Sequence, residues 1–157
     1  MYRIRPATLD DLEALVHHRL GMFTDMGVPI DRPAIEDAFR RWVADAIPHG
    51  AYRAWLIETD QEAGPRVVAG GGITVLTWPP GPFYLGGRVA FVYNVYTEPS
   101  HRRRGLARMV MDAIHGWCRS NGVGVVGLNA SDEARRLYES LGYRPAANPL
   151  MWVDLQS

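Results

Sequence analysis

The sequence predicts a single α/β domain over residues 1–157, and two observations lead to that class. Short runs rich in β-branched and aromatic residues alternate with longer segments whose apolar residues recur at helical spacing. A nearly continuous apolar run over residues 88–97 leads through an arginine-rich loop directly into an amphipathic helical pattern. The predicted order is one strand, two helices, three strands, helix, strand, helix, strand, with no internal repeat.

Two helices are predicted in the N-terminal third. Thr8, followed three residues later by Asp11, resembles a capping box with aspartate in place of glutamate, and it predicts a helix that ends near Gly27. The second helix begins at residues 31–33, because proline suits a first helical turn, and it ends at Pro48. Both segments repeat apolar residues at helical spacing, so each is expected to bury one face.

Three strands are predicted around these helices. Residues 2–6 form the first, and residues 51–59 and 66–77 form an antiparallel pair across the turn-forming residues 60–65. Three consecutive glycines, residues 70–72, interrupt the last of these strands. Glycines inside a strand predict a bulge or the close approach of another backbone or a ligand, and a bulge is the simpler expectation.

The C-terminal half alternates strand and helix. Residues 88–97 predict a central strand covered on both faces, because the run is nearly continuous in apolar residues. The remaining predicted elements are a helix from Gly105 to about Asn121, a strand over Val123–Leu128, a helix capped by Ser131 that ends at Gly142, and a last strand over Tyr143–Val153.

The loop before the longer C-terminal helix has the chemistry of an anion-binding site. It reads His101-Arg-Arg-Arg-Gly-Leu-Ala107, so positive charge collects where a helix begins. The first N–H groups of a helix lack partners inside it and carry partial positive charge, which favours a phosphate. Gly105 has no side chain to keep a phosphate from the backbone, and Ala107 leaves the first turn open. The sequence therefore predicts a phosphate-binding loop.

Charge and composition argue against several other classes. Acidic and basic residues balance at 17 each, whereas residues 101–108 hold four arginines and no acid, which favours one anionic ligand over nucleic acid. The single cysteine, Cys118, excludes an internal disulfide and disfavours a cysteine-based metal site. No apolar stretch approaches the ~20 residues that span a bilayer, and none has the form of a signal peptide. We expect a cytoplasmic protein with no metal, no nucleic-acid partner and no membrane partner.

Two motifs resemble those of the GNAT superfamily of acyl-coenzyme A-dependent N-acyltransferases. Arg102, Gly105 and Ala107 fit the pattern Q/R-x-x-G-x-G/A of the family's pyrophosphate loop. The run Asn129-Ala-Ser-Asp-Glu-Ala-Arg-Arg-Leu-Tyr-Glu-Ser-Leu-Gly-Tyr143 is similar to the second signature, a helix ending in Leu-Tyr-x-x-x-Gly-aromatic beside the coenzyme's thiol. The resemblance covers nearly the whole chain. It implies a mixed central sheet, splayed between its fourth and fifth strands, with acetyl-coenzyme A (acetyl-CoA) as cosubstrate.

The resemblance also implies roles for individual residues. Tyr138 would donate a proton to the leaving thiolate, and the backbone N–H of Val95 would stabilise the oxyanion formed when an amine attacks the acetyl carbon. From the pattern alone, Tyr138 is a core aromatic residue of an amphipathic helix and Asn129 is a turn residue. The residues expected to bind the cosubstrate are Val95, Tyr96, Thr97, Arg102, Arg103, Arg104, Gly105, Leu106, Ala107, Arg108, Asn129 and Arg135.

The sequence does not identify the base that deprotonates the amine. Residues 88–97 contain no carboxylate or histidine, although some relatives place a glutamate on this strand. One alternative is a water chain ordered by polar side chains of this strand, and the other is a base from elsewhere in the chain. The candidates are Tyr93, Asn94 and Tyr96 for the water chain, and His17, His18, Asp25 and Glu58 for a direct base.

These expectations describe an N-acetyltransferase that transfers the acetyl group of acetyl-CoA to a primary amine of a small-molecule or amino-acid-like acceptor in a ternary complex. Residues 21–32 and 78–87 are expected to select the acceptor, and Asp25 and Asp31 would attract a cationic amine. Two alternatives stay open: an acyl-CoA sensor without turnover, and an acetyltransferase that acts on a protein or peptide amine. The resemblance alone implies a homodimer.

Overall fold

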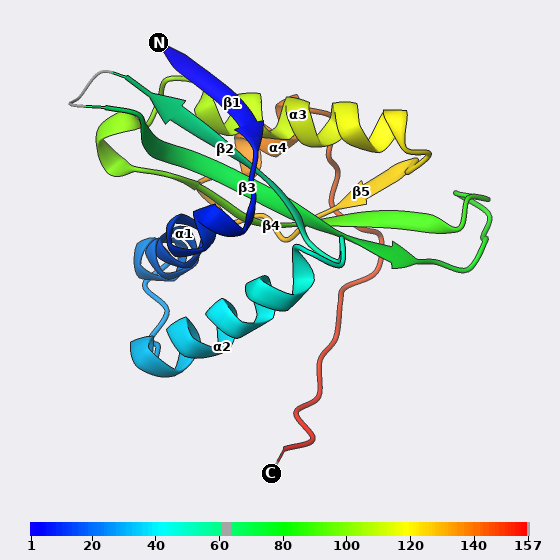
Figure 1. Cartoon of the computed structure of the whole chain (residues 1–157). Coiled ribbons are helices and arrows are strands. Elements are labelled where there is room, and N and C mark those ends of the chain that lie inside the picture. Colours follow the sequence, from blue (N-terminus) through cyan, green and yellow to red (C-terminus); the bar gives the residue numbers. More distant parts are fainter. Residues whose placement is uncertain (61–63, 157) are drawn as a thin grey trace.

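A mixed sheet of five strands, covered by helices on both faces, forms the centre of the protein (Figure 1). The computed structural model describes residues 1–60 and 64–156. Its elements are β1 (Tyr2–Pro6), α1 (Leu12–Asp25), α2 (Arg32–Ala46), β2 (Arg53–Thr59), β3 (Arg66–Thr77), β4 (Arg88–Thr97), α3 (Leu106–Ser120), β5 (Val125–Gly127) and α4 (Arg135–Ser140). The strands lie side by side in chain order, antiparallel except for the parallel pair β4 and β5. Helices α1 and α2 lie on one face, and α3 and α4 on the other (Figure 1).

The predicted fold class is confirmed, and so are most of the predicted elements. Strands β1, β3 and β4 have the predicted bounds, and β2 begins slightly later than predicted, at Arg53. The capping box is present, since the Asp11 carboxylate accepts a hydrogen bond from the Thr8 N–H at 2.8 Å. The first turn after this cap is a 3₁₀ turn, so α1 itself begins at Leu12. The turn predicted at residues 60–65 lies partly outside the described residues.

Two apolar clusters hold the helices against the sheet. The apolar face of α3 packs on β2, β3 and β4, and its residues Val110, Met111 and Ile114 are fully buried. On the other face, α1 and α2 enclose a second cluster that includes Tyr52 and Leu56. Burial of apolar surface on both faces therefore holds the sheet between the two layers of helices.

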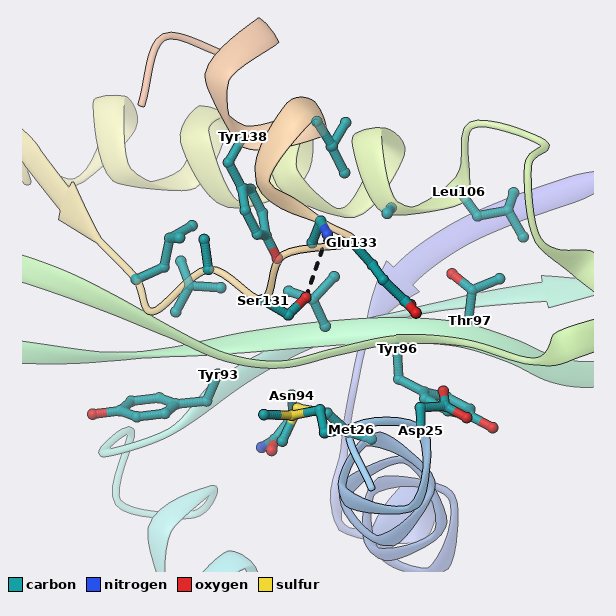
Figure 2. Close-up of a pocket in the computed structure, with 18 of the residues that line it drawn as sticks. Asp25, Met26, Tyr93, Asn94, Tyr96, Thr97, Leu106, Ser131, Glu133 and Tyr138 are labelled. Atoms are coloured by element: carbon teal, nitrogen blue, oxygen red, sulfur yellow. Dashed lines mark hydrogen bonds between the residues drawn. The ribbon is translucent and has the colours of Figure 1, made fainter. Parts of the chain in front are cut away.

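The predicted bulge lies opposite the three glycines, but the extra residue is on β4 and not on β3. Gly72 pairs with Tyr93 and Gly70 pairs with Tyr96, so β4 uses one residue more than β3 between these pairs. Asn94 takes the left-handed conformation that this requires, with φ of 61°. A Cβ on Gly72 would lie 2.7 Å from the Arg53 carbonyl oxygen, so the predicted close approach of another backbone is also present, and it would lie 2.4 Å from the Tyr52 hydroxyl. As a result, Tyr93 and Asn94 both project toward the α1 side of the sheet (Figure 2).

The last predicted strand, Tyr143–Val153, is not formed. Residues 143–156 have no regular secondary structure and lead away from the sheet (Figure 1). Pro145 and Pro149 have no backbone N–H to donate to a neighbouring strand, and β5 is only three residues long. The tail leaves several large apolar side chains exposed, namely those of Leu150, Met151, Trp152, Val153 and Leu155.

The other C-terminal elements are shorter than predicted. Strand β5 is confined to Val125–Gly127, and α4 begins at Arg135 although Ser131 was predicted to cap it. The Ser131 hydroxyl accepts a hydrogen bond from the Ala134 N–H at 3.3 Å, which closes one separate turn before the helix (Figure 2). The bond that a cap would make is therefore present, one turn ahead of the helix itself.

The predicted splay between the fourth and fifth strands is confirmed. Pairing between β4 and β5 stops at Phe91 and Gly127, whereas β4 continues to Thr97. Beyond Phe91, one edge of β4 therefore has no neighbouring strand among the described residues on the β5 side. Backbone groups at such an edge are free to bind an extended ligand.

Candidate active site

A cleft of about 1140 Å³ lies at the splay between β4 and β5. Its walls come from α1, β4, the arginine loop, the start of α3, the loop after β5, and α4 (Figure 2). Most of the residues predicted to form the site line it, namely Val95, Tyr96, Thr97, Arg102, Arg103, Gly105, Leu106, Ala107, Arg108, Asn129 and Tyr138. The fold thus brings together two motifs and a strand that are far apart in the sequence.

Two predicted residues do not line the cleft. The Arg104 guanidinium donates a hydrogen bond to the Tyr2 hydroxyl at 3.0 Å. The Arg135 side chain forms an ion pair with Glu139, one turn further along α4, at 2.9 Å. Both guanidinium groups thus have partners within the chain, and a contact of either with the cosubstrate stays a prediction.

The arginine loop ends at the start of α3, which lines the cleft, and Gly105 leaves the backbone open there as predicted. Gly105 is the residue before the first turn and has φ of 78°, a left-handed conformation that favours glycine. A Cβ built there meets nothing within 4 Å, so the space beside the backbone is open. Gly105 precedes this 15-residue helix and has no side chain that could cap its first N–H groups. These features fit a pyrophosphate held by backbone N–H groups at a helix start.

The arginines of the loop differ in what they contact. Arg102 donates to the Thr97 carbonyl oxygen at 2.9 Å and forms an ion pair with Asp25 of α1. Arg108 donates to the Ser140 hydroxyl at 2.6 Å. Arg103 has no hydrogen bond or ion pair with any residue that the structure describes, and it lines the cleft. Arg103 is therefore the guanidinium most available to an incoming phosphate.

Tyr138 projects from α4 into the gap between the strands (Figure 2). Its side chain is buried, its hydroxyl points toward β4, and its ring makes an edge contact with Tyr143 at 5.8 Å between centroids. Burial raises the pKa of the Tyr138 phenol, so the group carries its proton at neutral pH. A protonated phenol in this position can act as a proton donor to a group bound in the cleft.

Only one of the four candidate bases, Asp25, lines the cleft, and its carboxylate is bound by Arg102. Glu58 forms ion pairs with Arg3 and Arg5 on the β1 side of the sheet. His17 is exposed and contacts Glu98. The buried His18 ring lies against Tyr96, with 5.1 Å between centroids. The three candidates for ordering water, Tyr93, Asn94 and Tyr96, all line the cleft.

His18 is expected to make the free energy of unfolding depend on pH. Burial, and then the neighbouring His17, lower the pKa of His18 to about 4. The unfolded chain binds this proton below pH ~6.5, so the free energy of unfolding falls as the pH drops from there toward 4. Between pH 7 and pH 5 we expect His18 to contribute a loss of about 2 kcal/mol, measured by urea unfolding at both pH values.

A His18→Gln variant should lose less stability than the wild type over the same pH interval. His49→Gln is the matched control, because the His49 side chain is 74% exposed. An equal loss in the wild type and the His18 variant would show that His18 does not remain neutral in the folded protein.

Three charged residues that line the cleft were not among the predicted site residues, namely Arg19, Asp132 and Glu133. The Glu133 side chain extends toward β4 (Figure 2). Arg19 of α1 was not considered, and it lines both the main cleft and a second cavity. A lone arginine four residues before Phe23, within an otherwise apolar helical face, was the available signal.

The described part of the chain holds neither a membrane-spanning helix nor a cluster of metal ligands. No helix in residues 1–60 and 64–156 is both long enough and apolar enough to cross a membrane. Within the same residues, no three histidine, cysteine or acidic side chains come together as a metal site would require.

Comparison with known proteins identifies the fold as that of acetyltransferases. Residues 13–143 match the family model of the acetyltransferase (GNAT) family. A GCN5-related N-acetyltransferase from Ralstonia eutropha JMP134 is 30% identical and has a TM-score of 0.87, with 98% of this chain and 99% of that chain covered. The chain belongs to the GNAT family of acetyltransferases.

Two more distant structures share the fold. A predicted acetyltransferase from Clostridium acetobutylicum, solved with acetyl-CoA, is 24% identical with a TM-score of 0.86, covering 98% of this chain and 96% of that chain. Glucosamine-6-phosphate N-acetyltransferase from Arabidopsis thaliana is 18% identical with a TM-score of 0.73, covering 98% of each chain. A search of curated proteins found no match. Family membership supports acetyltransferase activity with an acyl-CoA cosubstrate.

Proposed function

We propose that the protein is an N-acetyltransferase that transfers the acetyl group of acetyl-CoA to a primary amine of a small-molecule acceptor. The observation that carries this proposal is the cleft at the splay, because it joins an uncapped helix start, a free strand edge and the hydroxyl of a buried tyrosine. These three parts fit the diphosphate, the pantetheine arm and the thioester of one extended ligand. In this proposal acetyl-CoA and the acceptor are bound together, and the transfer is direct.

Different residues of the cleft would bind the pyrophosphate and the pantetheine arm of acetyl-CoA. The N–H groups after Gly105, together with the Arg103 guanidinium, would hold the pyrophosphate. The free edge of β4 beyond Phe91 would pair with the amide groups of the pantetheine arm, as a strand added to a sheet would. Asn129, in the loop after β5, lies where it would contact the same arm.

The chemical step then involves two groups of this chain. The amine nitrogen attacks the acetyl carbonyl carbon, and the backbone N–H of Val95 would stabilise the negative oxygen that develops. The C–N bond forms, the C–S bond breaks, and Tyr138 would give its proton to the departing sulfur. Water ordered by Tyr93, Asn94 and Tyr96 would accept the proton that the amine loses.

A covalent acetyl-cysteine route has no support here. Cys118, the only cysteine, is buried in α3 and is not among the residues that line the cleft. Burial raises the pKa of the Cys118 thiol, which disfavours the nucleophilic thiolate.

Calorimetric titration with acetyl-CoA, followed by a screen of amine acceptors for release of the coenzyme thiol, tests the proposal. Micromolar binding and turnover of a small amine are expected. Binding without turnover of any small amine or N-terminal peptide would favour a sensor, and turnover of peptides alone would favour a protein acceptor. Absence of binding would overturn the proposal.

We infer further that the exposed tail mediates a homodimer. Leu150, Met151 and Trp152 are 64%, 85% and 84% exposed, which is unusual for three large apolar side chains in sequence. Among the described strands, β5 pairs only with β4, so its outer edge is open to a second copy. Light scattering at micromolar concentration should show a dimer for the full chain and a monomer when the chain ends at Asn148. A full-length monomer under these conditions would contradict the inference.

A further inference from the structure

A second cavity, of about 620 Å³, lies between α1 and α2 and the neighbouring part of the sheet. It meets the main cleft at four residues that line both spaces, namely Arg19, Phe23, Tyr93 and Asn94. The remaining lining residues are Ala34, Ile35, Ala38, Phe39, Trp42 and Thr74. A volume in this range suits a small molecule, and the shared residues would let that molecule reach across β4 into the cleft.

The wall of this cavity is mostly apolar, and Arg19 is the one charged residue among the described residues that line it. Arg19 is partly buried, and its guanidinium lies 4.7 Å from the centre of the Phe23 ring and 5.3 Å from that of Phe39. Its Nη1 donates to the Asn94 side-chain oxygen at 2.7 Å. No carboxylate in the described part of the chain forms an ion pair with Arg19, and no acidic residue lines the cavity. The cavity therefore presents a cation without a counterion.

The acidic residues expected to attract a cationic amine have other partners. Asp25 is bound to Arg102, and the Asp31 carboxylate caps α2 by accepting from the Ala34 N–H at 3.1 Å. A cationic acceptor with no negative group would meet the Arg19 charge without compensation. Burial lowers the pKa of the Arg19 guanidinium, the direction expected for a cation that is short of both water and a counterion.

The fold holds Arg19 in place through the bulge of β4. Asn94 is turned toward the α1 side by its left-handed backbone, is buried, and donates from its Nδ2 to the Tyr52 hydroxyl at 2.9 Å. The chain of contacts from Tyr52 through Asn94 to Arg19 restricts the guanidinium without neutralising it. A positioned guanidinium with free N–H groups matches the two oxygens of a carboxylate.

The cavity wall also holds an unsatisfied hydroxyl. The Oγ1 atom of Thr74 is buried and is the only such side-chain oxygen or nitrogen in residues 1–60 and 64–156 without a hydrogen-bond partner. Buried polar groups nearly always have a partner, but this oxygen is inaccessible from the cavity, so the argument for a ligand depends on Arg19 and the apolar wall.

We propose that the acceptor is a small amine that carries both a carboxylate and an apolar side chain, as an amino acid with a large apolar side chain does. The carboxylate would pair with Arg19, the apolar group would lie among the α2 side chains, and the amine would point toward the cleft. This inference rests on the proposed N-acetyltransferase activity and names its substrate class. Polycationic and sugar-like amines fit the cavity poorly, because it offers one positive charge and few polar groups.

Matched acceptors test the carboxylate and the apolar group separately. With acetyl-CoA saturating, release of the coenzyme thiol is followed for L-phenylalanine, L-phenylalaninamide, 2-phenylethylamine, (1-amino-2-phenylethyl)phosphonic acid and glycine. We expect kcat/KM for phenylalanine to exceed that of the amide and of phenylethylamine at least tenfold, and that of glycine by a similar factor. The phosphonate separates a need for any anion from a need for a carboxylate.

Variants assign the preference to Arg19. In Arg19→Gln, kcat/KM for phenylalanine should fall at least tenfold while that for phenylethylamine stays within about threefold, and Arg19→Lys should recover part of the loss. Arg41→Gln is the control, because Arg41 is exposed on α2, pairs with Asp37 and does not line the cavity. Equal losses for phenylalanine and phenylethylamine in Arg19→Gln would overturn the assignment.

A binding measurement separates this inference from the proposed function. N-acetyl-L-phenylalanine and N-acetyl-2-phenylethylamine are titrated into the complex with coenzyme A, where only the first is expected to bind tightly and only with Arg19 present. Turnover of amines without a carboxylate preference would overturn this inference and leave the proposed function intact. Arg19-dependent product binding without turnover would keep the binding site and contradict the catalytic proposal. Absence of both would overturn the inference.

Discussion

Replacing Gly105 with glutamate is expected to weaken acetyl-CoA binding at least 100-fold. Gly105 has a left-handed backbone, and the space beside its Cα is open toward the cleft at the start of α3. A glutamate there would place a carboxylate where the pyrophosphate is proposed to lie and would add about 1–2 kcal/mol of backbone strain. Isothermal titration calorimetry with acetyl-CoA measures the loss directly.

Gly122→Glu is the matched control for this substitution. Gly122 also has a left-handed backbone, with φ of 71°, and a Cβ there also meets nothing within 4 Å. It lies at the opposite end of α3 and does not line the cleft. The two variants therefore share the strain and the added charge and differ in location. Similar binding by both would contradict the proposed role of the arginine loop.

Local patterns were sufficient to predict three of the features that border the cleft. The apolar run of β4, the glycine before α3 and the amphipathic face of α3 each depend on neighbouring residues, and all three lie where predicted. The left-handed backbone of Gly105 was not predicted. Periodicity and cap chemistry are local properties, so a single sequence contains them. The splay followed from the family resemblance, because pairing between distant strands leaves no local pattern.

The wrong predictions, of a last strand and of a bulge on β3, concern features that depend on contacts between residues distant in the sequence. The apolar residues of the tail resemble a strand, but a strand forms only by pairing with a neighbouring edge. No described strand pairs with residues 143–156, and the one open edge on that side belongs to β5, which is only three residues long. The glycines of β3 indicated a bulge, yet the residue that adopts it is Asn94 of the facing strand. Which of two paired strands carries the extra residue depends on packing, here the Tyr52 hydroxyl against Gly72.

In the candidate site too, local motifs predicted which residues come together, whereas the partners of single side chains could not be predicted. Most of the motif residues line one cleft. Arg104 and Arg135 do not line it, and their guanidinium groups contact Tyr2 and Glu139 instead. Arg19 was not predicted as a site residue. Only the folded structure shows that it lies beside a mostly apolar cavity and pairs with no carboxylate of the described residues. The presence or absence of a partner is a property of the folded chain.

Replacing Tyr138 with phenylalanine is expected to lower kcat by about 100-fold while the affinity for acetyl-CoA stays within about threefold, as loss of a general acid does. The substitution removes the hydroxyl that points into the cleft and keeps the ring that packs in the core beside Tyr143. Steady-state rates with a saturating amine, together with calorimetry, separate the two effects. An unchanged kcat would remove Tyr138 from the proposed mechanism.

Tyr143→Phe serves as the control for this prediction, because it removes a hydroxyl from a tyrosine that touches Tyr138 without lining the cleft. The Tyr143 hydroxyl contacts His115 Nε2 at 2.7 Å, so its loss affects packing between α3 and the tail and leaves the cleft unchanged.

If Tyr138 acts as an acid and not merely as a core residue, an acyl thioester with a more acidic thiol should reduce the loss of kcat in Tyr138→Phe. A departing thiolate that is already stable needs less help from a proton donor. An equal defect with both thioesters would indicate that the hydroxyl acts through structure and not through proton transfer.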